Sequence, residues 1–177
     1  LQIAEEIEAV GGYLNAYTSR EATAYHSRIL KDNLPLAIDI LADILQNSTF
    51  DATEFSREQS VIVQEIGQTF DTPDDIIFDY FQETCFPDQP MGRAILGTAE
   101  IVRSLTPQQV KAYMQDHYGA HQMVFAAAGK LDHQEIVDMV AEKFAHLPID
   151  CPKEASAAVY KGGTFHQTRE LEQTHVI

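Results

Sequence analysis

Two acidic residues, Glu58 and Glu65, stand seven positions apart in a segment whose apolar pattern predicts a long helix. Seven residues are close to two full turns, so both carboxylates project from the same helix face. Val61, Ile62 and Val63 lie between them, and this leads us to expect a largely buried helix. A buried carboxylate must be paired, hydrogen-bonded or bound to a metal, because an isolated charge is strongly disfavoured among apolar groups. The pair is therefore a candidate element of a metal site, and the alternative is an acidic stripe on an exposed helix.

A longer pattern surrounds this helix. It runs through Gly11–Tyr25 and Leu34–Ser48 into the helix, and continues through Met91–Thr98 and Tyr118 to Met123–Gly129. This order of motifs resembles the M16 zinc peptidases, the family of mitochondrial processing peptidase, pitrilysin and insulin-degrading enzyme. The resemblance covers nearly the whole chain.

Members of that family are inverzincins, in which an H-x-x-E-H helix supplies two zinc-binding histidines and a catalytic glutamate. A third ligand, also a glutamate, comes from a later helix that carries another glutamate seven residues earlier. The resemblance therefore implies that Glu65 is a zinc ligand. It also implies that Glu58 does not touch the metal but orients the histidine ligands. A structural salt bridge to an arginine is the alternative role for Glu58.

The resemblance also implies a substrate-binding role for Asn15 and Ala16. Both lie in the predicted strand Tyr13–Thr18. In the family this strand borders the cleft, and the substrate peptide pairs with it through main-chain hydrogen bonds. The side-chain amide of Asn15 can serve a substrate backbone group, and the alternative is an ordinary strand asparagine.

No H-x-x-E-H sequence occurs in the 177 residues. In the family that motif lies just upstream of the segment that begins here at Leu1, and residues 1–10 read as the middle of a helix without a cap. We therefore expect a chain truncated at both ends, with the general base upstream of Leu1. Lacking two of three zinc ligands, the 177 residues alone are expected to be inactive.

Composition limits the other classes of function. Lys and Arg total 12 against 27 Asp and Glu, a net charge of −15 that disfavours nucleic acids and anionic membranes as partners. A hydrophobic content of 45% indicates a folded globular chain, and no apolar run reaches the roughly 18 residues of a membrane span. Cys85 and Cys151 lack C-x-x-C spacing and leave the compartment unknown.

A second possible metal pair, His117 and His121, has the i, i+4 spacing of helical ligands. Gly119 lies between them and a strand is predicted from Gln122, so a continuous helix through both is not expected. A histidine at a helix C-terminus is instead favoured by the helix dipole. No G-x-S-x-G motif and no glycine-rich phosphate loop is present.

The periodicities predict an α+β fold, with a mixed, largely antiparallel sheet and helices packed on one face. We expect residues 1–150 to be part of an N-terminal M16 peptidase domain, 151–163 a connection and 164–177 a strand entering the next segment. The predicted elements, in chain order, are a helix at 1–10, strands at 13–18 and 22–30, helices at 34–46, 51–69, 73–86 and 106–119, a strand at 122–128, and a helix at 132–145.

The resemblance implies a zinc-dependent metalloendopeptidase that cleaves peptides or unfolded segments with a metal-activated water. A second M16 half-domain or partner subunit is expected to complete the cleft. The alternative is a non-catalytic M16-like subunit that binds substrate or supports assembly.

Overall fold

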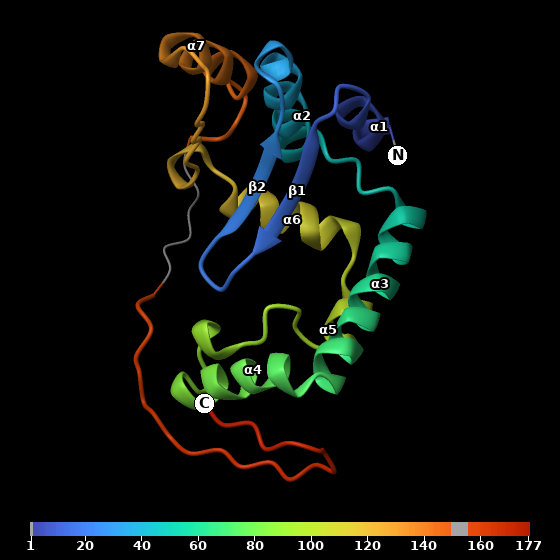
Figure 1. The fold of residues 1–177 in the computed structure, drawn as a ribbon, viewed down its shortest axis with the longest axis vertical. Coiled ribbons are helices and arrows are strands. Elements are labelled where there is room, and N and C mark those ends of the chain that lie inside the picture. The colour runs from blue at the N-terminus through green and yellow to red at the C-terminus, as the bar shows by residue number, and fades with distance from the viewer. Residues whose placement is uncertain (1, 150–155) are drawn as a thin grey trace. The chain divides into compact units, whose positions relative to one another are not determined.

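The computed structural model describes residues 2–149 and 156–177, and these residues form two compact units. The first unit contains residues 2–18, 22–50 and 110–149, and the second contains 19–21, 51–109 and 156–177. Figure 1 labels the main elements. In chain order they are α1 (Gln2–Ala9), β1 (Tyr13–Thr18), β2 (Thr23–Arg28), η1 (Lys31–Asn33), α2 (Leu34–Asn47), α3 (Ala52–Asp71), α4 (Pro73–Cys85), η2 (Pro90–Gly92), α5 (Ala99–Ser104), α6 (Pro107–His117), η3 (Ala120–Gln122) and α7 (His133–Lys143).

The first unit is built around a β-hairpin. β1 pairs with β2 in antiparallel register, with Asn15 opposite His26 and Ala16 opposite Tyr25. Alternate residues point to opposite faces of a strand, so Asn15 and Ala16 lie on different faces of the hairpin. This hairpin is the only sheet formed by the described residues.

A small apolar core holds α1 and α2 against β1. Ile7, Ala37 and Ile40 are buried together. The half-buried side chains packed around them come from β1, the residue after β2, and α2, and are Leu14, Ile29, Leu36 and Ile44. The three- and four-residue spacing of apolar side chains in α2 turns one face of that helix towards this core.

The second unit places α3 against α4 and α5. Its buried apolar side chains include Cys85 at the end of α4 and Val102 in α5. Gly92 is required between them, because a Cβ at this position would lie 2.1 Å from the carbonyl oxygen of Phe86.

Local capping signals place several helices where the sequence predicts them. The Asp51 carboxylate accepts hydrogen bonds from the N–H groups of Thr53 and Glu54 at the start of α3. Asp132 caps α7 in the same way. Such caps satisfy first-turn amides that have no partner within the helix.

Two predicted strands are wrong. Residues 123–128 form no paired strand, and Val124 is 93% exposed. Residues 164–177 also lack strand structure. An alternating or apolar pattern specifies an extended backbone, but a strand also needs a partner to bond with. Among the residues that the structure describes, no second strand lies beside either segment.

The predicted α+β class is confirmed, although the sheet formed here is only the hairpin. The short α5, capped by Thr98, was not predicted. Over the described ranges, no helix is both long and apolar enough to cross a lipid bilayer.

Candidate functional site

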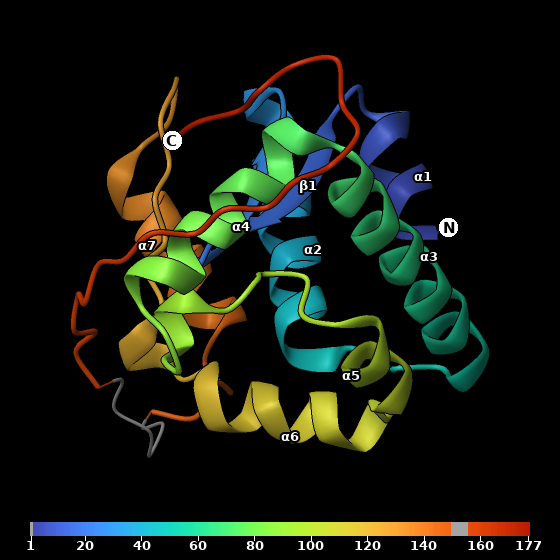
Figure 2. The same ribbon diagram turned by 90° about the horizontal axis from the view of Figure 1, so that it is seen from below.

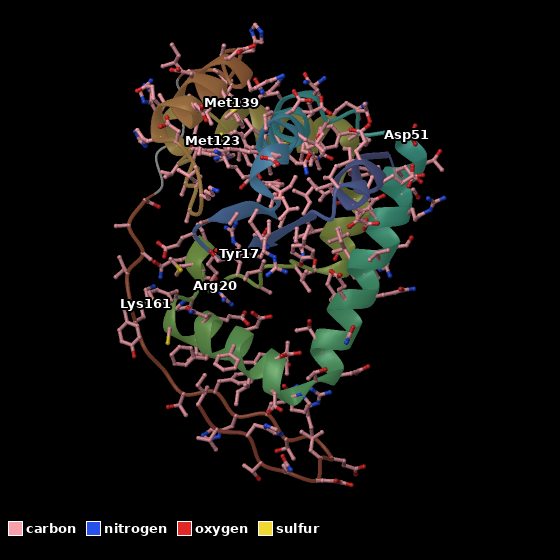
Figure 3. The ribbon with its side chains drawn as sticks, turned by 45° about the horizontal axis from the view of Figure 1, so that its top comes forward. Tyr17, Arg20, Asp51, Met123, Met139 and Lys161 are labelled. Atoms are coloured by element: carbon pink, nitrogen blue, oxygen red, sulfur yellow. The ribbon has the colours of Figure 1, made fainter. Side chains whose placement is uncertain are left out.

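α3 carries Glu58 and Glu65 on one face, and both side chains are exposed. Figure 3 shows Asp51 at the end where this helix begins. The expectation of a buried helix is wrong, because α3 has no buried residue and Val61, between the acids, is 40% exposed. Within the second unit α3 packs against α4 and α5, and Arg169 contacts Phe70 near its C-terminal end. These contacts leave Glu58 and Glu65 exposed.

Gln59 fixes the rotation of α3. Its side-chain amide donates to the carbonyl oxygens of Val102, at 2.7 Å, and Leu105, at 3.1 Å, near the end of α5. Successive residues of a helix are about 100° apart, so Glu58 is turned well away from this contact. The acids therefore lie beside the packed face rather than beneath it.

The salt bridge considered for Glu58 is not formed among the described residues. Arg57, the nearest arginine in sequence, donates instead to both carboxylate oxygens of Glu54, at 2.8 and 2.9 Å. Glu58 and Glu65 have no hydrogen-bond or ion-pair partner within residues 2–149 and 156–177. Their carboxylates are thus available to a ligand.

The residues present do not make a complete zinc site. A catalytic zinc in a protein usually has three side-chain ligands and one open position. No group of three or more His, Cys, Asp or Glu residues able to hold a metal occurs in the described part of the chain. Glu58 and Glu65 are about 10 Å apart along the helix axis, so they suit different roles rather than direct ligation of one ion.

The edge of β1 presents a main-chain donor. The N–H of Ala16 donates to Oδ1 of Asn15 at 2.8 Å. Directly opposed residues in antiparallel strands alternate between pairs that exchange main-chain hydrogen bonds and pairs that do not. Because the Ala16 amide bonds to a side chain of its own strand, we infer that the Ala16–Tyr25 pair is of the second kind. The Ala16 main chain then faces the outer edge of β1.

The side-chain amide of Asn15 is held at both ends. Its nitrogen donates to the Tyr13 hydroxyl at 2.5 Å while its oxygen accepts from Ala16. On the same exposed face the rings of Tyr13 and Tyr17 lie 6.0 and 6.1 Å from the His26 ring.

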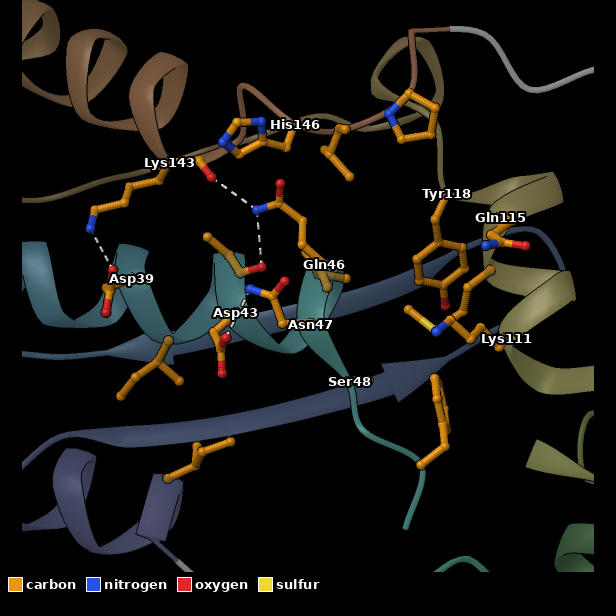
Figure 4. Close-up of a pocket in the computed structure, with 18 of the residues that line it drawn as sticks. Asp39, Asp43, Gln46, Asn47, Ser48, Lys111, Gln115, Tyr118, Lys143 and His146 are labelled. Carbon is orange, nitrogen blue, oxygen red and sulfur yellow. Dashed lines mark hydrogen bonds and ion pairs between the residues drawn. The ribbon is translucent and has the colours of Figure 1, made fainter. Parts of the chain in front are cut away.

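A cavity of about 760 Å³ in the first unit was not predicted (Figure 4). It is lined by α2, the last part of α6 and the segment after α7. Among its charged groups, Lys143 donates to Asp39 at 2.5 Å. Gln46 donates to the carbonyl oxygens of Ala42 and Lys143, and its own oxygen is buried without a partner.

Tyr118 borders this cavity, and its hydroxyl oxygen lies 3.4 Å from that of Tyr25. Burial raises the pKa of the Tyr25 phenol above its ordinary value, and the Tyr118 hydroxyl adds to the effect. The Tyr25 phenol is therefore suited to hydrogen bonding rather than to proton transfer near neutral pH.

α6 ends at His117, while His121 lies in η3, so the two histidines do not share a helix. The His117 ring instead stacks on Tyr113, with 4.3 Å between ring centres. This agrees with the predicted helix end near Gly119.

Arg20 lies in the turn between β1 and β2, yet its side chain is only 18% exposed and donates to Asp79 of α4 at 2.7 Å. The two residues are 59 positions apart, so no local pattern could indicate their contact.

Two family profiles match the chain. The profile described as Insulinase (Peptidase family M16) matches residues 1–99, and the one described as Peptidase M16 inactive domain matches residues 104–177. A Rickettsia felis protein named as an uncharacterized zinc protease is 39% identical over 176 residues, which cover 99% of this chain and 43% of the relative. The Saccharomyces cerevisiae mitochondrial-processing peptidase subunit beta is 36% identical over 178 residues, covering 97% of this chain and 38% of that protein. The chain spans about two fifths of the length of these relatives.

Solved structures share the fold. A structure titled as a peptidase M16 inactive domain from Pseudomonas fluorescens matches 89% of this chain and 39% of its own, with a TM-score of 0.79 and 20% identity. A protease from Helicobacter pylori matches 90% of this chain and 39% of its own, with the same TM-score and 19% identity. Since the first profile covers more than half of its residues, the chain belongs to the insulinase family of peptidases, M16.

Proposed function

We propose that the chain is part of a zinc-dependent metalloendopeptidase that hydrolyses peptide bonds in peptides or unfolded segments. The observation that carries this proposal is the pair Glu58 and Glu65, two turns apart on an exposed face of α3 in an M16 sequence, whose carboxylates have no partner among the described residues. When bound, zinc would activate a water for attack on the peptide carbonyl. Relatives named as zinc proteases support the choice of metal.

Each acid is given one role in this proposal. Glu65 binds the zinc directly, and Glu58 orients the groups that hold it. The 177 residues contain no H-x-x-E-H motif. In this proposal the other ligands and the general base come from such a motif elsewhere in the longer protein.

Asn15 and Ala16 hold the substrate. The outward-facing main chain of Ala16 can pair with an extended peptide, in the manner of an added strand. The Asn15 side chain supports this role, because its oxygen occupies the Ala16 N–H until a peptide carbonyl replaces it. Residues 1–150 form part of the peptidase domain in this proposal, and a second M16 half-domain or partner subunit completes the cleft.

A second function has specific support. Residues 104–177 match a profile described as an inactive domain, and several relatives are named as β subunits of a processing peptidase. In this alternative the longer protein lacks catalysis and binds substrate or supports the assembly of a partner subunit.

The deciding experiment uses the full-length protein that contains this sequence. Glu65→Gln is expected to lose zinc and peptidase activity together, whereas Glu58→Gln keeps the fold and loses about 10–100-fold in activity. Glu54→Gln is the matched control, because Glu54 lies on the same helix but is already paired with Arg57. Metal content and peptide turnover are measured for all three.

Full zinc and full turnover in Glu65→Gln would refute the ligand assignment. A wild-type protein that folds but neither binds zinc nor cleaves peptides would favour the non-catalytic alternative.

A further inference from the structure

The C-terminal segment from Val159 to Arg169 lies along the second unit in a regular order. Its contacts run from the turn after α4 back towards the end of α3 (Figure 2). In order along the segment they are Val159 with Gln89, Lys161 with Cys85, Gly163 with Thr84, Phe165 with Tyr80 and Arg169 with Phe70. As one partner's number rises the other's falls, so the segment runs antiparallel to α4.

Gln89 binds the main chain of Val159 with both ends of its amide. The Val159 N–H donates to Gln89 Oε1 at 2.7 Å, and Gln89 Nε2 donates to the Val159 carbonyl oxygen at 2.9 Å. A strand residue makes the same two-bond exchange with its neighbour in a sheet. The Gln89 side chain therefore satisfies both main-chain groups of Val159, as a neighbouring strand would in a sheet.

A second main-chain contact follows two residues later. The N–H of Lys161 donates to the carbonyl oxygen of Cys85 at 2.9 Å. Cys85 is the last residue of α4, where helical carbonyls have no partner within the helix. The segment thus satisfies an acceptor that the helix end leaves open.

Glycines let the segment approach α4 closely. Gly162 and Gly163 have φ values of +67° and +153°, which side-chain-bearing residues rarely adopt. A Cβ on Gly163 would also lie 2.9 Å from Cγ2 of Thr84. Position 163 therefore excludes any larger residue for two independent reasons.

The side chains of the segment are held much less than its backbone. Val159 is 61% exposed and Tyr160 is 69% exposed, although Tyr160 touches Phe86 with its ring edge. Phe165 packs on Tyr80 with 4.7 Å between ring centres. Recognition at the clamped residue is thus independent of its side chain, while Gly163 and Phe165 add selectivity.

We propose that Tyr80, Thr84, Cys85 and Gln89 form a binding site for extended polypeptide, recognised through its main chain. The occupant in this structure is the chain's own segment 159–165, and the site admits another peptide of the same pattern when that segment is released. The pattern is an unrestricted clamped residue with glycine four positions and an aromatic residue six positions after it. This site uses neither Glu65 nor β1, so it stands apart from the proposed peptidase function.

The test uses the full 177-residue chain and a fluorescent peptide with the sequence of residues 156–167. Val159→Pro removes the N–H that Gln89 accepts and should release the segment. The peptide is expected to bind this variant at least tenfold more tightly than it binds wild type. Adding Gln89→Ala should weaken that binding at least tenfold, whereas Gln64→Ala, on the exposed side of α3, should leave it unchanged.

Two altered peptides test the recognition itself. A peptide with Gly163→Ala should lose binding, and one with Val159→Thr should keep it. Hydrogen exchange provides a measurement that needs no added peptide: the amide of Lys161 should exchange about tenfold faster in Gln89→Ala than in wild type or Gln64→Ala.

Absence of peptide binding to Val159→Pro would overturn the proposal. So would binding that ignores Gln89→Ala or tolerates alanine at position 163. Unchanged exchange at Lys161 in Gln89→Ala would show that the clamp does not hold the segment.

Discussion

Gln46 of α2 donates its side-chain amide to the main-chain carbonyl oxygen of Lys143, the last residue of α7, at 2.9 Å. The same amide nitrogen donates to Ala42 one turn back in its own helix. A single side chain therefore joins two helices through residues that are 97 positions apart in sequence. The Lys143 side chain makes a second link between them through Asp39.

Replacing Gln46 by Ala is expected to lower the free energy of unfolding by about 0.5–1.5 kcal/mol, because it removes the hydrogen bond to the exposed Lys143 carbonyl oxygen that links the two helices. Gln134→Ala is the control, since Gln134 lies on the exposed side of α7 and its side chain donates to Asp138 of the same helix. That change should stay within about 0.5 kcal/mol. Urea denaturation measures both, and equal effects would show that the Gln46 link is not stabilising.

Asp51→Ala removes the N-cap of α3 and should lower the free energy of unfolding by about 1 kcal/mol. Asp71→Ala, at the other end of the same helix, serves as the control. An acid near a helix C-terminus opposes the helix dipole, so its removal should be neutral or slightly stabilising. Thermal or urea unfolding distinguishes the two variants, and a larger loss from Asp71→Ala would contradict the capping role.

The raised pKa of the Tyr25 phenol leads us to expect a loss of stability in alkaline solution. Its pKa is raised in the folded chain, first by burial and then by the Tyr118 hydroxyl. The folded state thus favours the protonated phenol, and this contribution is complete below the usual tyrosine pKa of about 10 and is lost above it. Unfolding free energy should fall as pH rises past about 10, and less steeply in Tyr25→Phe. The exposed Tyr17→Phe should follow wild type; identical slopes for all three would contradict the assignment.

Ala16→Pro tests the substrate role in the full-length protein. Proline removes a main-chain donor from the edge of β1, so peptide binding should weaken far more than zinc binding. Asn15→Ala should raise KM or lower kcat while the metal content stays unchanged. Steady-state kinetics and metal analysis give both readouts. A peptide-bound structure with the substrate away from β1 would exclude this mode.

The 177-residue chain by itself is expected to retain no stoichiometric zinc after dialysis and to cleave no peptide. One available carboxylate cannot replace the three ligands of a catalytic site. Metal analysis of the purified chain checks this, and tight one-to-one zinc would show that other residues supply the missing ligands.

The helix starts were predicted most accurately from the sequence. The caps at Asp51 and Asp132 and the start of α6 at Thr106 were predictable, because each depends on residues within one turn of the cap. The predicted strand at 122–128 is wrong, because an apolar sequence cannot reveal whether a pairing partner lies beside it.

In the candidate site too, features that depend on local spacing were predictable and features that depend on tertiary packing were not. The shared helix face of Glu58 and Glu65 followed from their spacing, but their exposure depended on which helices cover α3. The clamps made by Gln59 and Gln89 could not be predicted, since each joins residues more than 40 positions apart. Nothing in a glutamine's local sequence marks it for such a contact.

The hydrogen bond from Ala16 to the side chain of Asn15 also bears on self-association. An outward-facing amide on an edge strand is a template on which a second copy of the chain can add its own strand. By accepting that hydrogen, Asn15 lowers the gain from such pairing without blocking the edge with a charge or a proline. The edge of β1 is thereby less open to stacking between copies, while a partner able to displace one side-chain amide can still reach it.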